Sequence, residues 1–360
     1  MNTQYKKIAD DFYQNHDFSG TCLVKKGDEI LFSGAYGFAH RGFQVPNRLD
    51  TKFDTASVTK VFTATAILIL VEQGALHLED KITEVVDLEG TEIPTDVTIE
   101  HLLTHTSGIA DDADEEAGEN YADLFVDKPN YSIRNTADLL SQFVHKKPLF
   151  KAGTNVRYNN CAFVLLGLAI EKFSDMDYRT FVMENIVKPC ELNNTEFCTM
   201  DEVNGNTAEG YTAIEDEDSH ITGWKKNIYS YPPIGAPDGG IYSTVEDLDK
   251  FLRSLKAGKL LSPKYTDMLF QPHCSFAKPF TRWKPELNAT ITMGYSFEFV
   301  GLDQKIFCVR KDGMNDGVAA MLSYYPETDV SLVILSNQDC NIWEMHREMQ
   351  TVLYDTFYLN

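Results

Sequence analysis

Hydrophobic residues follow two different spacings along the 360-residue chain, and the change of spacing divides it into three parts. Near both ends, short apolar runs rich in β-branched and aromatic residues, bounded by Gly, Asp and Asn, predict β-strands. These strands span residues 18–25, 30–36, 290–299, 305–310, 318–325 and 330–336. Between them, apolar residues recur every three or four positions, which predicts helices. These helices span residues 57–73, 99–103, 160–173, 178–187 and 245–255, and two more, 5–15 and 343–357, lie at the chain ends.

Strands at both ends with helices between them indicate an α+β fold. We expect one antiparallel β-sheet that is built from both chain ends and flanked by the N- and C-terminal helices, with a mostly helical domain inserted in the middle. The predicted sheet domain comprises residues 1–60 and 273–360, and the predicted helical domain comprises residues 61–272. The active site is expected at the interface of the two domains.

The charge balance narrows the possible functions. Acidic residues number 54 and basic residues 32, which gives a formal net charge of −22. This charge excludes a nucleic-acid-binding protein that works by neutralising phosphates, and it argues against docking on an anionic membrane. Two acidic stretches, residues 111–116 and 215–218, are expected to be solvated loops, with a part in substrate selection as the alternative.

Neither a membrane span nor a secretion signal is predicted. The longest apolar stretch, residues 61–71, is about half of the roughly 20 residues that a bilayer-spanning helix needs. The first residues contain no apolar signal segment, so we expect a cytoplasmic protein, with export as the alternative. The seven cysteines are odd in number and widely spaced, which predicts buried reduced thiols rather than a disulfide framework or a zinc ribbon.

No metal or cofactor site is predicted either. His101 and His105 stand four residues apart on a predicted helix, a spacing that can bind zinc, but no third ligand is evident near them. We expect both histidines to pack and to cap that helix where it ends at Thr106-Ser107-Gly108.

The strongest chemical signal is the segment Ser57-Val58-Thr59-Lys60. Residues three apart share one face of a helix, so the Lys60 amine can reach the Ser57 hydroxyl, which is a poor nucleophile without a base. The apolar run that follows would bury the helix and hold the serine at its exposed end. A second S-x-x-K match at Ser275 is followed directly by Pro279, which argues against a helix there.

Two further triplets sharpen this interpretation. Tyr158-Asn159-Asn160, a Y-x-N pattern, precedes the predicted helix 160–173, and Lys311-Asp312-Gly313, a K-x-G pattern, follows the predicted strand 305–310. Each pattern occurs elsewhere in the chain, but only one combination places S-x-x-K, Y-x-N and K-x-G in this order on suitable elements.

With these motifs, the sequence resembles the superfamily of serine β-lactamases and penicillin-binding proteins, and within it class C β-lactamases and related esterases and D-aminopeptidases. The resemblance extends to residues 53–60, 98–108 and 238–248, and it runs from about residue 18 to residue 340 in the order of the family. It implies a β-lactamase/transpeptidase-like fold and an acyl-enzyme mechanism.

The resemblance also implies a role for each motif residue. Ser57 would be the acylated nucleophile, with Lys60 as its general base. Tyr158 would pass protons to the leaving group and activate the deacylating water, its phenol pKa lowered by Lys60 and Lys311. Asn160 would bind the substrate amide or orient Lys60.

The third motif carries the oxyanion site and one departure from the family pattern. The backbone N–H groups of Ser57 and of Met314, which follows Gly313, would form the oxyanion hole. The middle position of the motif is commonly Thr or Ser, whose hydroxyl helps to bind a substrate carboxylate, but here it is Asp312. An anion at this position is expected to repel such a carboxylate.

We therefore expect a serine hydrolase that forms an acyl-enzyme with esters, amides or peptide-like substrates, and whose partner is a small molecule or a short peptide. The alternative enzyme is a β-lactamase or a low-molecular-mass penicillin-binding protein (a D-alanyl-D-alanine carboxypeptidase). The alternative without turnover is a sensor or binding module that stays acylated. The natural substrate and the oligomeric state are left open by the sequence.

Overall fold

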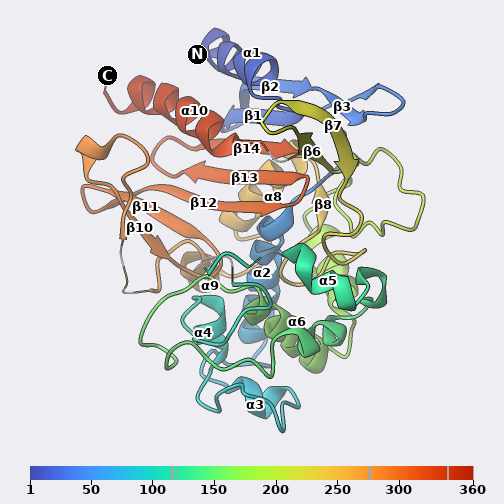
Figure 1. Ribbon diagram of the computed structural model, residues 1–360. Helices are drawn as coiled ribbons and strands as arrows, with labels where there is room; N and C mark the ends of the chain where they lie inside the picture. The colour runs from blue at the N-terminus through green and yellow to red at the C-terminus, as the bar shows by residue number, and fades with distance from the viewer. Residues whose placement is uncertain (115–116, 120, 275, 277, 339, 360) are drawn as a thin grey trace.

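The computed structural model describes residues 1–360 except 115–116, 120, 275, 277, 339 and 360. Among the described residues, eight strands form one antiparallel sheet in the order β2-β1-β14-β13-β12-β11-β10-β9 (Figure 1). Its strands are β1 (Gly20–Lys26), β2 (Glu29–Tyr36), β9 (Lys278–Pro279), β10 (Thr290–Met293), β11 (Glu298–Leu302), β12 (Lys305–Asn315), β13 (Val318–Tyr325) and β14 (Val330–Ser336). Because β1 pairs with β14 along its whole length, both chain ends build the same sheet. The expected α+β architecture is confirmed.

Helices cover both faces of this sheet. On one face lie α1 (Asn2–Asn15) and α10 (Ile342–Phe357), which pack against each other, and α8 (Val245–Lys256) packs on the opposite face (Figure 1). Side chains alternate along β14. Leu332 and Ile334 join the apolar core beneath α10, whereas Val333 and its neighbour Leu335 join the core beneath α8.

The helical part of the molecule is built around α2 (Thr59–Glu72). Every side chain from Thr59 to Leu70 is buried, as expected of a helix that is apolar on all sides. The other helices are α3 (Ile82–Val85), α4 (Ile99–Leu103), α5 (Leu124–Asp127), α6 (Cys161–Ser174), α7 (Tyr178–Val182) and α9 (Pro263–Leu269). Of these, α6, α7 and α9 contact α2 directly. A 3₁₀ turn, Ala56–Val58, precedes α2 and contacts β12, so the start of this buried helix lies against the sheet.

Three short two-stranded sheets complete the fold among the described residues. They pair β3 (Phe38–His40) with β4 (Val45–Pro46), β5 (Phe53–Asp54) with β8 (Tyr242–Ser243), and β6 (Tyr211–Glu215) with β7 (Ile221–Lys226). The prediction of a mostly helical middle did not include the β6–β7 hairpin. Most of its side chains are exposed or half-buried, so the hairpin carries no regular apolar pattern.

The structure also corrects two strand predictions. The expected strand 290–299 is two strands, because the chain turns at Gly294, whose N–H donates to the carbonyl of Phe297, and Ser296 adopts a φ of +70°. The expected strand 305–310 is longer, since β12 continues through the K-x-G triplet as far as Asn315.

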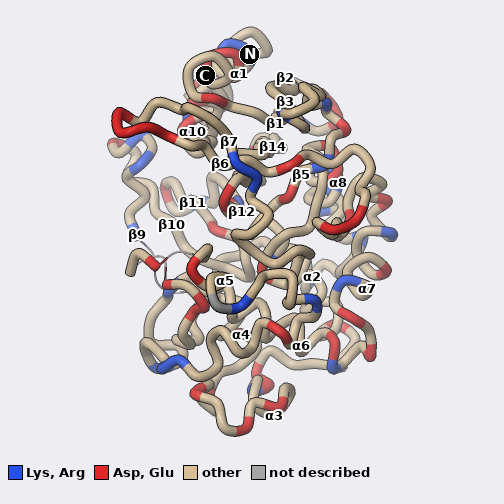
Figure 2. The backbone as a smooth tube through the Cα atoms, turned by 45° about the vertical axis from the view of Figure 1, so that its right-hand side comes forward, with Lys and Arg blue, Asp and Glu red and all other residues tan. Residues whose placement is uncertain are grey.

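Charged side chains are spread over helices and loops alike, with Asp and Glu in the majority (Figure 2). The acidic stretch 215–218 follows β6 in the hairpin turn and is exposed, as predicted. No disulfide bond joins any two cysteines among the described residues, and all cysteines but Cys340 are buried. Among the described residues, no helix is both long enough and apolar enough to cross a membrane. The division into residues 1–60 with 273–360 and residues 61–272 stays a prediction.

Candidate active site

Ser57 lies in the 3₁₀ turn that leads into α2, and a strained residue stands before it. Ala56 has a φ of +43°, a left-handed conformation that is unfavourable for a residue with a Cβ. The buried carboxylate of Asp54 stabilises this turn, because its Oδ1 accepts a hydrogen bond from the Ala56 N–H at 2.7 Å. Burial raises the pKa of Asp54 to about 6. The Ser275 alternative lies outside the described residues.

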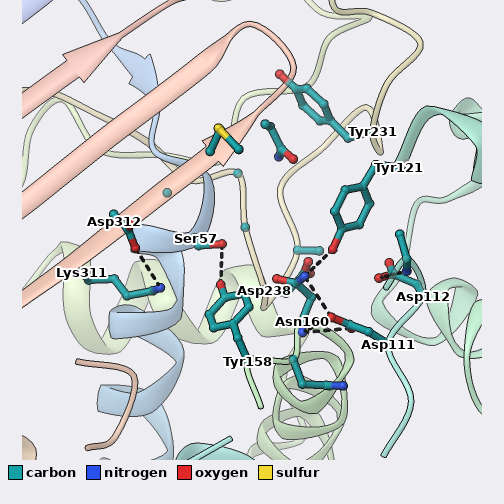
Figure 3. A pocket seen from close by; sticks show the side chains of 18 of the residues that line it. Ser57, Asp111, Asp112, Tyr121, Tyr158, Asn160, Tyr231, Asp238, Lys311 and Asp312 are labelled. Carbon is teal, nitrogen blue, oxygen red and sulfur yellow. Dashed lines mark hydrogen bonds and ion pairs between the residues drawn. The ribbon is translucent and has the colours of Figure 1, made fainter. Parts of the chain in front are cut away.

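The Ser57 hydroxyl is held between a phenol, which Figure 3 shows, and an amine. Tyr158 donates to Ser57 Oγ at 2.8 Å, and Lys60 Nζ donates to the same oxygen at 3.1 Å. Lys60 is completely buried, and its Nζ also donates to Asn160 Oδ1 at 2.7 Å and to the carbonyl of Asp238. These three contacts match the three donors of an ammonium group. Lys60 and Tyr158 therefore meet at the Ser57 oxygen, and Asn160 joins them through its bond with Lys60.

Lys311 brings the third motif to the same place. Its side chain is 2% exposed, and its Nζ lies 4.7 Å from the centroid of the Tyr158 ring. Lys60 Nζ lies 5.2 Å from the same centroid. Two cationic groups beside one phenol favour negative charge on the phenol oxygen. Proton transfer through Tyr158 is thus electrostatically supported.

Strand β12 presents an open backbone edge to the nucleophile. It pairs with β11 only as far as Arg310, but with β13 as far as Asn315, so its last residues have one unpaired side. A Cβ at Gly313 would lie 2.7 Å from the backbone nitrogen of Ser57, so only glycine permits this approach. The next residue is Met314, whose side chain is exposed. This edge can supply the second N–H of an oxyanion hole beside that of Ser57.

The Asp312 carboxylate contacts two side chains, those of Lys311, its neighbour in sequence, and Trp343, which is distant in sequence. One carboxylate oxygen accepts a hydrogen bond from Trp343 Nε1 at 2.7 Å, and the other lies 3.7 Å from Lys311 Nζ (Figure 3). Burial raises the pKa of Asp312, but the charge of Lys311 and the indole N–H of Trp343 outweigh it, so the pKa is lowered. Asp312 is therefore ionised at neutral pH, and it partly neutralises Lys311.

The two histidines have separate packing roles. His101 caps the beginning of α4, where its Nδ1 accepts from the Thr98 N–H at 3.2 Å, so the prediction that it caps the end of this helix is wrong. The imidazole of His105 packs against the Tyr158 ring at a tilt of 35°, with the ring centroids 4.6 Å apart, and its Nδ1 accepts from the Asn159 N–H. Burial, together with the charges of two nearby lysines, holds the pKa of His105 well below its usual value. A neutral ring thus supports the phenol.

The prediction of a solvated loop for residues 111–116 is wrong at its start, and residues 115–116 lie outside the described residues. Asp112 is buried, and Asp111 binds backbone N–H groups at the beginning of α6, an end that attracts carboxylates. Burial raises the pKa of Asp112 to about 8, and the charges of Asp111 and Asp238 add to the effect.

The oxygens of Asp111 and Asp112 and the sulfur of Cys161 lie within 4.8 Å of one another. Burial raises the pKa of Asp112 and holds that of the Cys161 thiol well above its usual value, so a cation that bound here would have to displace protons from both groups. Protonated carboxyl and thiol groups bind metal ions weakly.

The nucleophile and most of the side chains around it line one cavity of about 450 Å³, a size typical of a small-molecule site. Its wall contains Ser57, Tyr158, Asn160 and Lys311. Acidic side chains outnumber basic ones in this wall: the acids are Asp54, Asp111, Asp112, Asp114, Asp238, Glu298 and Asp312, and the bases are Arg157, Lys278 and Lys311. The cavity therefore disfavours anionic groups away from Lys311.

Sequence reasoning missed three residues of the site. Asp54 stands inside the segment that carries the nucleophile, so its position was visible but its bond to the backbone was not. Asp111 begins the acidic stretch, where only its charge was noted. Trp343 reaches Asp312 from α10, and no local sequence signal could have indicated that contact.

Known proteins are similar to this chain over most of its length. The family model for β-lactamase matches residues 6–350. Penicillin-binding protein 4* of Bacillus subtilis (strain 168) is 27% identical over 336 residues, which cover 91% of this chain and 69% of that protein. Protein flp of Staphylococcus aureus (strain N315) is 25% identical over 336 residues, which cover 92% of this chain and 62% of that protein.

A solved structure agrees with these sequence matches. The crystal structure of a penicillin-binding protein from Bacillus halodurans superposes with a TM-score of 0.87 and 34% identity, covering 97% of this chain and 99% of that one. The chain belongs to the β-lactamase family, and with it to the serine hydrolases that act on amides, esters or peptides.

Proposed function

We propose that this protein hydrolyses esters, amides or short peptide-like substrates by transferring their acyl group first to Ser57 and then to water. The observation that carries the proposal is the Ser57 hydroxyl between Tyr158 and Lys60, at 2.8 and 3.1 Å. A serine hydroxyl needs such a partner to become a nucleophile, and a buried amine is a suitable one.

Acylation starts from the form of the protein in which the Lys60 ammonium group has released a proton to solvent. The neutral amine then takes the proton of the Ser57 hydroxyl while Oγ attacks the substrate carbonyl carbon. The resulting oxyanion accepts hydrogen bonds from the backbone N–H groups of Ser57 and Met314. The bond to the leaving group then breaks as Tyr158 gives that group its proton, and Lys60 returns a proton to Tyr158. The products of this step are the acyl-enzyme and a neutral amine or alcohol.

Deacylation repeats these transfers with water as the nucleophile. A water molecule attacks the ester carbonyl, and its proton passes to the Lys60–Tyr158 pair. The C–O bond to Ser57 breaks, and Oγ recovers a proton from the same pair. The resemblance to class C enzymes implies that Tyr158 takes part in activating this water. The two lysines beside the Tyr158 ring support this role, because positive charge nearby favours the phenolate.

A β-lactamase or a D-alanyl-D-alanine carboxypeptidase is the second candidate, favoured by the similarity to two penicillin-binding proteins. We propose that the enzyme prefers neutral or cationic esters and amides as substrates. The ionised Asp312 is already paired with Lys311, the cation that would bind a substrate carboxylate. A cytoplasmic location is part of the proposal, and the lack of disulfide bonds among the described cysteines is consistent with a reducing compartment.

The test is intact-protein mass spectrometry after exposure to p-nitrophenyl esters, D-amino-acid amides and β-lactams. Wild-type protein should gain one acyl group on Ser57 and turn over, whereas Ser57→Ala should gain none and lose hydrolysis by several orders of magnitude. An adduct on Ser275, or substantial turnover by the alanine variant, would refute the mechanism. A single burst without turnover would identify a sensor instead of an enzyme.

A further inference from the structure

Asp111 lies in a loop outside α6, but its carboxylate binds backbone N–H groups at the beginning of that helix. Its two oxygens each accept from the Asn160 backbone N–H at 3.0 Å, and Oδ1 also accepts from the Cys161 N–H at 2.9 Å. Asn160 is the N-cap residue of α6, yet its side chain makes no capping bond. Asp111 therefore caps this helix from a separate loop, together with Asn159, whose Oδ1 accepts from the Ala162 N–H at 2.6 Å, and the Asn160 side chain is left available for another contact.

The same carboxylate also determines which way the Asn160 amide faces. Asn160 Nδ2 donates to Asp111 Oδ2 at 3.3 Å and to the hydroxyl of Tyr121, which leaves Oδ1 to accept from Lys60 Nζ at 2.7 Å (Figure 3). The reversed amide would place its carbonyl against a carboxylate and its NH₂ group against an ammonium group. Both contacts would be repulsive, because a carboxylate can only accept and an ammonium group can only donate.

We propose that Asp111 is a positioning residue that, by orienting Asn160, holds the Lys60 amine on the Ser57 hydroxyl. This inference rests on the proposed function, in which Lys60 takes the Ser57 proton. Asp111 does not touch the reacting oxygen, since its effect passes through Asn160 Oδ1, one of the three acceptors around Lys60 Nζ.

The variant Asp111→Asn separates positioning from capping. Asparagine keeps one carbonyl oxygen that can accept from the backbone N–H groups of Asn160 and Cys161, but its own NH₂ group competes for the place of the Asn160 amide group. Asp177→Asn is the matched control, because Asp177 caps α7 by accepting from two backbone N–H groups. We expect Asp111→Asn to lower kcat for a neutral activated ester by about 10- to 100-fold, with KM nearly unchanged. Asp177→Asn should keep the wild-type kcat.

A double-mutant cycle shows whether the effect passes through Asn160. If it does, Asp111→Asn should cost no more than about twofold in kcat when Asn160 is already alanine. Asp111→Ser, a second capping residue, is measured in parallel. Of Asp111→Asn and Asp111→Ser, the variant whose thermal midpoint stays within a few degrees of that of the wild type is used for the comparison of kcat.

The inference is overturned if that folded variant has the wild-type kcat. It is also overturned if the Asp111 substitution lowers kcat by the same factor in the Asn160→Ala background as in the wild type. The proposed function fails separately, since it fails if wild-type protein is not acylated on Ser57. If Ser57 is acylated normally in the wild type and the Asp111 substitution leaves kcat unchanged, only the positioning role of Asp111 is overturned.

Discussion

Replacing Asp312 by threonine should shift the preference of the enzyme toward substrates that carry a carboxylate. In the wild type, the Asp312 carboxylate lies 3.7 Å from Lys311 Nζ, and Trp343 holds it in place. A substrate carboxylate that approaches Lys311 therefore meets a cation that is already paired. Threonine removes the competing charge and adds a hydroxyl that can donate a hydrogen bond.

The size of the shift follows from the geometry. Two like charges about 4 Å apart repel by about 4 kcal/mol at an effective dielectric constant of about 20. Lys311 offsets much of this repulsion because it attracts the substrate carboxylate. We therefore expect a net penalty of about 1–2 kcal/mol, or roughly five- to thirtyfold in kcat/KM.

The assay compares kcat/KM for a penicillin with that for a matched neutral ester. Asp312→Asn removes the charge but keeps an acceptor for Trp343, so it separates the effect of charge from that of the new hydroxyl. Asp218→Thr, in the exposed β6–β7 turn, makes the same change in net charge away from the cavity and should leave the ratio unchanged. The reasoning is refuted if the wild type already prefers the penicillin, or if both Asp312 variants keep the wild-type ratio.

Three further outcomes are expected. Gly313→Ala would place a Cβ 2.7 Å from the Ser57 nitrogen. The two N–H groups of the oxyanion hole should then move apart, and kcat should fall by about 10²- to 10³-fold. An unchanged kcat would show that β12 can shift without harm to catalysis. Asp112→Asn should raise the thermal midpoint, increasingly from about pH 4 to about pH 8, because over this range the folded wild type keeps a proton that the unfolded chain releases; a gain that does not depend on pH contradicts this. Ester hydrolysis should fall at acid pH as the groups around Lys60 take up protons, with apparent pKa values that belong to the coupled group; a flat profile, with chemistry limiting the rate, argues against the mechanism.

Local sequence was sufficient for the parts of the site that lie on one element. The spacing of Ser57 and Lys60 places both side chains on one side of a helical turn, and the apolar run after them requires a buried helix. The apolar runs at both chain ends likewise indicated the single antiparallel sheet, which the pairing of β1 with β14 confirms. The meeting of the three motifs followed from the family resemblance, since their separation in sequence says nothing about their distance in space.

Only the tertiary structure decided the contacts between elements that are far apart in the chain. Asp111 reads as one charge in an acidic stretch until the fold sets it against the free N–H groups of α6, where a carboxylate replaces water. The sequence already places Asp312 next to Lys311, but only the fold brings Trp343 of α10 to the Asp312 carboxylate. Composition and spacing determine which groups a chain carries and which of them share a helix or a strand. Their ionisation and hydrogen bonds depend on burial and on the partners that packing supplies, and these arise only when the whole chain folds.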